Sequence, residues 1–292
     1  MRAEYSEDAG RVARDLKVLI IGGTGRVGRM LRRHWDARPP QGMLLTYQAR
    51  RGGDLTWSAE DGPEVLAAQG PFDRLLVLAG APPGAGADMQ QNVSIARICH
   101  AAAARMDAAH MLLASSAAVY GGARQRPYSE TDHPAPASAY GRAKLEAEAA
   151  VANGAPPVTA LRIGNVLGAD MLMLNARKAG ADAPLSLDRF ADGEGPQRSY
   201  IGPATLADVL ERLLRAGSAL PPLLNVGAPG PAAMRALLEK AGIPYKMRPA
   251  PPEAAQNIVI DCSALEQFYR FPREASDPEF MLEEWRQLRD AP

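Results

Sequence analysis

The sequence predicts an α/β fold built on a doubly wound parallel sheet. Three observations support this prediction: short apolar runs alternate with Ala-rich segments of helical periodicity, the runs are apolar throughout, and the first run leads into a glycine-rich turn. Strands that are apolar on both faces are typical of a parallel sheet covered by helices on both sides. At 292 residues, the chain can form one large domain or one domain with an appendage.

The first half of the chain follows a regular strand–helix rhythm. We expect strands at residues 17–21, 43–47, 74–79, 110–115 and 158–162, and helices at residues 27–36, 59–69, 90–105 and 139–152. Ser58 and Asp61 form a plausible cap for the second helix, and Gly154 with the following prolines ends the last one.

The regular alternation of predicted strands and helices ends after Gly168. Residues 169–203 are rich in Gly, Asp and Arg, and we expect loops with short helical pieces there. The later segments predict a helix at 205–215, a strand at 223–226, a helix at 232–241, an extended stretch at 257–261 and a final helix at 279–289.

Composition excludes several classes of function. Lys plus Arg and Asp plus Glu both total 33, so the balanced charge gives no reason to expect nucleic acid or a membrane surface as partner. The two cysteines and four histidines show no metal-ligand spacing, so no metal site is expected. No apolar stretch reaches the ~20 residues that cross a bilayer, and the charged first residues lack a secretion signal. These features predict a cytoplasmic protein.

The turn after the first strand carries a phosphate-binding pattern. Gly22, Gly25 and Gly28 form a GxxGxxG motif, with Arg26 and Val27 inside it. Glycines let the backbone turn sharply and approach a pyrophosphate, and the N-terminus of the following helix offers free N–H groups. A tight turn without a ligand is the alternative. Its position between the first strand and helix favours a dinucleotide cofactor and a Rossmann-type core.

The end of the second strand indicates which nicotinamide cofactor fits. No acid occurs there before Asp54, whereas Arg50 and Arg51 are adjacent and suit a 2′-phosphate. Arg26 could add to the same phosphate pocket. The alternative is that both arginines simply face water. We therefore expect NADP, with NAD also possible.

A Tyr–Lys pair carries the strongest chemical signal. Tyr140 and Lys144 lie four residues apart, on one face of the predicted helix. A nearby ammonium favours phenolate and lowers the pKa of a tyrosine, which makes Tyr140 usable as an acid or base. Such a pair is also common by chance on amphipathic helices. Ser116 supports the catalytic interpretation, because it ends an apolar strand where ligands bind in such sheets.

Together these blocks resemble the NAD(P)-dependent epimerase/dehydratase family of the extended short-chain dehydrogenase/reductase superfamily, from about residue 17 to residue 271. The matching motifs are S-x-x-V-Y-G at 116–121, Y-x-x-x-K at 140–144, L-R-x-x-N-x-x-G at 161–168, G-x-G with R-x-Y-I at 193–201, and the strand at 224–227. The resemblance implies Ser116, Tyr140 and Lys144 as the catalytic residues.

The resemblance also implies binding residues. Beyond the glycine turn and the arginines, expected cofactor contacts are Asp54, Leu55, Ala79, Gly80, Ala81, Asn92, Ala114, Ser115, Tyr140 and Lys144, and expected substrate contacts are Ser116, Asn165 and Arg198. Asn175 is a further candidate for substrate contact. The implied organisation is an N-terminal extension (1–16), a dinucleotide-binding core (17–168) and a mainly substrate-binding cap (169–292), with strand 223–226 returning to the core sheet. A homodimer through the helices at 90–105 and 140–152 is expected, although Ala-rich faces also pack within monomers.

The activity implied is Tyr-assisted hydride transfer on a carbonyl or hydroxyl, and the expected substrate is nucleotide-sugar-like. Ala117 and Ala118 replace the Asp–Glu pair of the family's dehydratases, so we do not expect removal of water. The motifs do not distinguish a reductase from an epimerase, because both use the same hydride chemistry. A catalytically silent NADP(H) sensor on the same fold is the alternative from a different class.

Overall fold

A parallel sheet forms the centre of the computed structural model, which describes residues 14–83, 86–180 and 183–289. Its seven described strands run in the order β11-β6-β5-β4-β1-β2-β3, and all neighbours are parallel. Their bounds are β1 (Leu16–Ile21), β2 (Met43–Ala49), β3 (Leu55–Thr56), β4 (Arg74–Val77), β5 (His110–Ser116), β6 (Val158–Ile163) and β11 (Leu223–Val226). The predicted α/β class is confirmed. Most of the predicted N-terminal extension (residues 1–16) lies outside the described residues.

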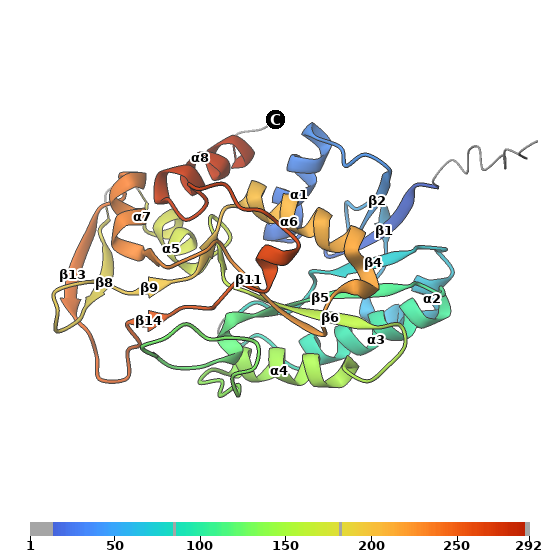
Figure 1. Cartoon of the computed structure of the whole chain (residues 1–292), viewed down its shortest axis with the longest axis horizontal. Coiled ribbons are helices and arrows are strands. Elements are labelled where there is room, and N and C mark those ends of the chain that lie inside the picture. The colour runs from blue at the N-terminus through green and yellow to red at the C-terminus, as the bar shows by residue number, and fades with distance from the viewer. Residues whose placement is uncertain (1–13, 84–85, 181–182, 290–292) are drawn as a thin grey trace, which may run out of the picture.

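Helices cover both faces of the sheet (Figure 1). On one face lie α1 (Arg26–Ala37) and α6 (Pro203–Ala216); on the other lie α2 (Gly62–Ala67), α3 (Gln91–Arg105) and α4 (Ala139–Val151). In β1, Val18 and Ile20 join the apolar cluster beneath α1 and α6, whereas Leu19 and Ile21 join the cluster beneath α2, α3 and α4. This two-sided burial explains why β1 is apolar at every position from Val18 to Ile21.

The predicted helix at 59–69 is shorter in the structure. A 3-10 turn (Ala59–Asp61) precedes α2, and the Asp61 carboxylate accepts a hydrogen bond from the Ser58 amide at 2.7 Å. The predicted Ser58–Asp61 cap is therefore present, but it opens the 3-10 turn. Gly62, which follows with φ of +81°, interrupts the regular α-helical path between the two pieces.

The second half of the chain builds a smaller lobe beside the carboxyl edge of the sheet (Figure 1). Its helices are α5 (Met171–Ala179), α7 (Met234–Ala241) and α8 (Pro278–Arg289); its short strands are β7 (Asn165–Val166), β8 (Leu185–Arg189), β9 (Gln197–Arg198), β10 (Tyr200–Ile201), β12 (Ala232–Ala233), β13 (Tyr245–Pro249) and β14 (Asn257–Ile258). The expectation of loops and short helical pieces for 169–203 missed β8, which pairs in parallel with β13 far along the chain.

Two elements of the second half return to the core. The strand predicted at 223–226 is β11, which pairs with β6 at the edge of the sheet, and α6 packs on the same sheet against α1. The division of the chain into a dinucleotide-binding core and a substrate-binding cap stays a prediction. Within the described residues, no helix is both long enough and apolar enough to cross a membrane.

A carboxylate from α8 caps α6. The buried Glu284 side chain accepts hydrogen bonds from the Ala204 and Thr205 amides, each at 3.1 Å, and from the Thr205 hydroxyl. The N-terminus of α6 begins at Gly202, which has no side chain to cap it. Glu284 therefore satisfies donors that would otherwise be buried without partners, and it couples the C-terminal helix to the core.

We expect Glu284→Ala to lower the free energy of unfolding by about 1–3 kcal/mol, because buried donors lose their acceptor. Chemical denaturation monitored by circular dichroism measures this change. Glu283→Ala is the matched control, since Glu283 is exposed one position earlier on the same helix. Equal stability of the two variants would show that the Glu284 contacts do not stabilise the α6–α8 junction.

Candidate functional site

The candidate site lies at the carboxyl edge of the central sheet. From β1 the chain moves to β2 on one side, while β4 pairs with β1 on the other side. In doubly wound sheets this reversal opens a crevice at the carboxyl ends of the strands, and ligands bind there. Ile21, Val77 and Ser116, which end β1, β4 and β5, all lie at this edge.

The glycine turn after β1 is packed so closely that side chains would not fit. Gly22 has φ of +91°, and a Cβ added to it would lie 2.8 Å from the Ala79 amide nitrogen. A Cβ on Gly28 would press against the Gly22 carbonyl oxygen and lie 2.8 Å from the Gly23 carbonyl oxygen. Gly25 precedes α1, and no side chain described here caps that N-terminus. The first turn of α1 therefore presents N–H groups that suit a phosphate, and the glycine turn leaves room for the phosphate to approach them.

A buried amide faces the space beside Gly80. The Asn92 side chain is 4% exposed, its Nδ2 donates to the Ala81 and Met89 carbonyls, and its Oδ1 has no hydrogen-bond partner among the described residues. A Cβ on Gly80 would press against that oxygen and lie 3.2 Å from Lys144 Nζ. A buried acceptor without a partner beside a glycine fits a ligand hydroxyl or amide.

Ser116, Tyr140 and Lys144 come together at the end of β5. The Ser116 hydroxyl hydrogen-bonds the Tyr140 hydroxyl and accepts from the Ala118 amide at 3.2 Å. Lys144 Nζ lies 5.9 Å from the centre of the Tyr140 ring and donates to the Ala114 carbonyl at 2.9 Å. The structure thus brings together the three residues predicted as catalytic.

The charges around Tyr140 differ from the sequence-based expectation. Burial raises the pKa of Tyr140 above its ordinary value, while the hydrogen bond from Ser116 and the positive charge of Arg26 lower it. Burial also lowers the pKa of Lys144 to about 8, against the opposing effect of Glu148. Arg26 is therefore a positive charge that favours the phenolate, a role that sequence reasoning did not assign to it.

Gly141 allows α4 to approach the end of β5. A Cβ at this position would press against the Ala118 carbonyl oxygen and lie 3.0 Å from the Pro136 side chain. Ser138 caps the same helix, because its hydroxyl accepts from the Gly141 amide at 3.0 Å. The glycine within the Tyr140–Lys144 segment is therefore needed to hold the phenol beside Ser116.

The residues that are predicted to decide between NADP and NAD lie at the end of β2. Arg50 and Arg51 are both exposed directly after the strand. The Asp54 carboxylate accepts from the Tyr47 amide at 3.0 Å and from Arg32 at 2.7 Å, so it faces the protein's own backbone and α1. Gln48 donates to the Trp57 carbonyl and accepts from the Gly22 amide, which ties the glycine turn to β2.

Two of the predicted substrate residues, Asn165 and Arg198, lie in the smaller lobe. Asn165, on β7, hydrogen-bonds the buried Tyr200 hydroxyl. Arg198, on β9, donates to the carbonyls of Gln197, Ala255 and Gln256 at 2.7–2.8 Å. Arg198 therefore holds the segment that leads into β14, and its role toward a substrate stays a prediction.

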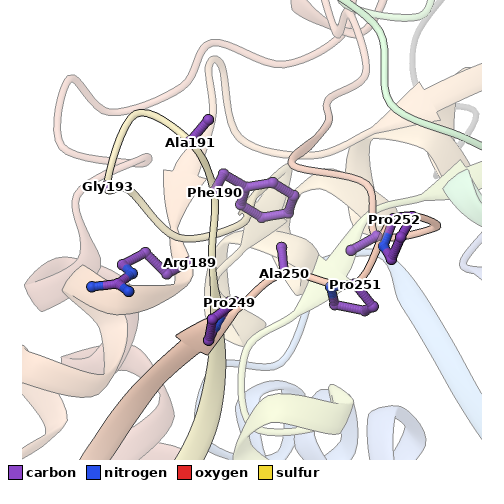
Figure 2. Close-up of a pocket in the computed structure, with 9 residues that line it drawn as sticks. Arg189, Phe190, Ala191, Gly193, Pro249, Ala250, Pro251 and Pro252 are labelled. Atoms are coloured by element: carbon purple, nitrogen blue, oxygen red, sulfur yellow. The ribbon is translucent and has the colours of Figure 1, made fainter.

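An open pocket of about 610 Å³ lies in the same lobe, between the turn after β8 and the segment after β13. Figure 2 shows the Phe190 ring between these two segments, with Ala250, Pro251 and Pro252 on one side and Arg189 extending away. None of the lining residues belongs to the glycine turn or to the Ser116–Tyr140–Lys144 group. The pocket therefore marks a second region that could receive a ligand.

Sequence reasoning missed an ion pair directly behind the Tyr–Lys pair. Glu148 and Arg162 are 7% and 3% exposed, and Arg162 Nη2 donates to Glu148 Oε2 at 2.8 Å. The available signal was the spacing: Glu148 lies four residues after Lys144 and eight after Tyr140, on the face of α4 that the sheet buries.

Comparison with known proteins supports the fold. Residues 85–188 match the model of the RmlD substrate binding domain family. No curated protein sequence matches the chain. Among solved structures, the Bordetella bronchiseptica enzyme WbmG in complex with NAD and UDP is 19% identical, with a TM-score of 0.74 over 92% of this chain and 94% of that one.

Two further structures give the same result. A UDP-N-acetylglucosamine 4-epimerase from Methanobrevibacter ruminantium is 17% identical, with a TM-score of 0.75 over 94% of this chain and 99% of that one. A short-chain dehydrogenase/reductase superfamily protein from Agrobacterium tumefaciens with bound NAD is 21% identical, with a TM-score of 0.73 over 94% and 97%. The chain therefore shares the fold of these three proteins, and the resemblance drawn from the motifs is confirmed at the level of the fold.

Proposed function

We propose that this chain is an NAD(P)-dependent enzyme that transfers hydride to or from a carbonyl or hydroxyl carbon of a nucleotide-sugar-like substrate. The observation that carries the proposal is the convergence at one sheet edge of the glycine turn, the unpartnered Asn92 Oδ1 and the Ser116–Tyr140–Lys144 group. Solved relatives with this fold include proteins bound to NAD and to UDP, which supports the choice of cofactor and substrate class.

The residues present fit a nicotinamide dinucleotide. The glycine turn and the N-terminus of α1 would hold the pyrophosphate, while Asn92 and Lys144 would face the nicotinamide end from beside Gly80. When bound, the nicotinamide supplies or accepts the hydride. Arg26, at the first position of α1, would add positive charge between the phosphates and Tyr140.

The side chains at the end of β5 would handle the substrate oxygen. Ser116 and Tyr140 hydrogen-bond each other, so one oxygen placed against both would replace that mutual bond. Tyr140 would give a proton to an alkoxide or take one from an alcohol, and Ser116 would fix the oxygen's position. Lys144, anchored to the Ala114 carbonyl, would donate to the cofactor ribose and stabilise the phenolate.

The smaller lobe would bind the remainder of the substrate. The Phe190 ring and the prolines around the pocket suit a planar base, and Arg189 adds a positive charge at its border. Asn165 and Arg198 remain candidate contacts there. A homodimer that pairs α3 and α4 across a two-fold axis also stays a proposal.

Product analysis by mass spectrometry and NMR tests the reaction. Purified protein would be incubated with a panel of nucleotide-sugars and keto-sugars, each with NADP(H) and with NAD(H). Inversion of a stereocentre without net change in cofactor indicates an epimerase, and consumption of the reduced cofactor indicates a reductase. Tight cofactor binding without turnover of any substrate would overturn the enzymatic proposal and favour the sensor.

We also propose that NADP is preferred over NAD, since Arg50 and Arg51 follow β2 without an acid beside the ribose position. Replacing both arginines by alanine is expected to weaken NADP⁺ binding by about 10²–10⁴-fold, because each of the two charge-assisted bonds to the 2′-phosphate contributes about 1.5–3 kcal/mol. Isothermal titration calorimetry measures both cofactors, and NAD⁺ affinity is the internal control. An unchanged ratio of the two affinities would contradict this preference.

A further inference from the structure

A buried ion pair joins α4, the helix that carries Tyr140, to β6, the strand beside the one that carries Ser116. Glu148 lies one turn after Lys144 on α4, and its carboxylate accepts from Arg162 Nε at 3.1 Å and from Arg162 Nη2 at 2.8 Å. The same carboxylate also accepts a hydrogen bond from the Ser115 hydroxyl. All three side chains belong to residues no more than 7% exposed.

These contacts form a two-point clamp between α4 and β5. Lys144 Nζ donates to the carbonyl of Ala114, and the next residue of β5, Ser115, donates to Glu148. Ser116 follows immediately, so the clamp fixes where its hydroxyl lies relative to Tyr140. Arg162 lies opposite Ser115 in the β5–β6 register, which places the cation behind the clamp.

The clamp extends to the edge of the sheet. The Arg162 guanidinium stacks over the Tyr120 ring at 4.8 Å, and the Tyr120 hydroxyl donates to Asn225 Oδ1 at 2.8 Å on β11. Arg162 Nη1 has no hydrogen-bond partner among the described residues. Well-packed apolar side chains often stabilise a core as well as a buried ion pair does. Stability alone therefore gives no reason for two buried charges at this place.

We propose that Glu148 and Arg162 are positioning residues for the Ser116–Tyr140–Lys144 centre: their ion pair and the Ser115–Glu148 hydrogen bond fix α4 against β6 and β5, and the pair places opposed charges behind the Lys144 ammonium. This inference rests on the proposed function for its effect on turnover. Its effect on the protonation of Lys144 does not depend on a substrate.

The charges around Lys144 determine in which direction its pKa is expected to change when the ion pair is broken. Burial lowers the pKa of Lys144 to about 8, and the Glu148 carboxylate raises it. The other titratable or charged groups packed around this centre are Tyr140 on α4, Tyr120 after β5, Arg162 on β6 and Arg26 on α1. From the α3 side, the group beside Lys144 is the uncharged Asn92.

Two single substitutions break the same ion pair but leave opposite charges behind. In Glu148→Gln the Arg162 cation remains. The pKa of Lys144 should therefore fall by at least about one unit. In Arg162→Met the Glu148 carboxylate remains, so Lys144 should lose its proton at higher pH than in the wild type. A merely structural role would destabilise both variants and move both titrations alike.

NMR titration of protein labelled with ¹⁵N at the lysine Nζ measures the protonation directly, with Lys144→Met assigning the signal. In parallel, kcat for the substrate found by product analysis should fall at least about fivefold at pH 8 in Glu148→Gln, because a pKa lowered by one unit from about 8 leaves about a fifth as much protonated Lys144, with the cofactor Kd unchanged. If Glu148→Gln does not fold, the double variant Glu148→Gln/Arg162→Met, which leaves no unpaired charge, should still show a Lys144 pKa below that of the wild type.

Lys144 titrations that coincide with the wild type, or that shift in the same direction in both single variants, would overturn the positioning role. Absence of turnover in the wild type would instead count against the proposed function.

Discussion

Tyr140→Phe is expected to reduce turnover by about 10²–10⁴-fold, the range that general acid–base catalysis contributes. The substitution removes only the phenol oxygen, which accepts the hydrogen bond from Ser116. The packing of α4 and the glycine turn stay as they are, so the Kd for the cofactor should not change. Steady-state kinetics and fluorescence titration of the cofactor measure the two quantities.

Tyr269→Phe is the matched control for the loss of a phenol oxygen. Tyr269 packs edge-to-face against Phe271, outside the site at the end of β5. This variant should keep wild-type turnover. If Tyr140→Phe also keeps it, Tyr140 is not the proton-transferring group and the proposed mechanism is wrong.

Gly28→Ala is expected to weaken cofactor binding by about 100-fold, which corresponds to about 2.8 kcal/mol. The added Cβ would press against the Gly22 carbonyl oxygen and lie 2.8 Å from that of Gly23, so α1 must move away from the turn. The N–H groups at its N-terminus would then no longer face the pyrophosphate. Isothermal titration calorimetry with NADP⁺ and NAD⁺ measures the loss.

Gly122→Ala is the matched control for this second prediction. A Cβ at Gly122 meets no atom within 4 Å, so both the fold and the affinity should be unchanged. Wild-type affinity in Gly28→Ala would show that the cofactor, if it binds, does not use the close approach of this turn.

Much of the core was predictable because its signals are local. β1 is apolar from Val18 to Ile21 and is followed directly by glycines, and the structure extends the predicted strand by only one residue, to Leu16. Ser58 and Asp61 also form the cap that their spacing predicts. The Tyr140–Lys144 spacing and the position of Ser116 at a strand end placed all three residues at one edge of the sheet.

The smaller lobe was less predictable because its order depends on contacts between distant segments. β8 contains Ser186, Asp188 and Arg189 and lacks a clear apolar pattern; its partner, β13, begins at Tyr245. Arg198 matches a substrate-binding motif, yet its guanidinium binds three carbonyls of the chain. A single sequence does not contain the distances that assign such partners.

The electrostatics of the site also required the structure. The spacing of Tyr140 and Lys144 predicts that the lysine lowers the pKa of the tyrosine, and the structure adds a positive charge that the spacing could not show, that of Arg26, more than a hundred residues earlier. Glu148 was visible as an acid on the buried face of α4. Its partner, Arg162, belongs to another strand and could not be assigned from helix periodicity.

Isotope transfer tests the central proposal most directly. Wild-type protein and Tyr140→Phe would be incubated with reduced cofactor deuterated at the hydride-donating carbon and with a panel of nucleotide-linked keto-sugars, and the products analysed by mass spectrometry. We predict a deuterium-labelled hydroxyl sugar with the wild type and at most a trace with Tyr140→Phe. Equal labelling by both proteins, or cofactor binding without labelling of any substrate, would contradict hydride transfer assisted by Tyr140.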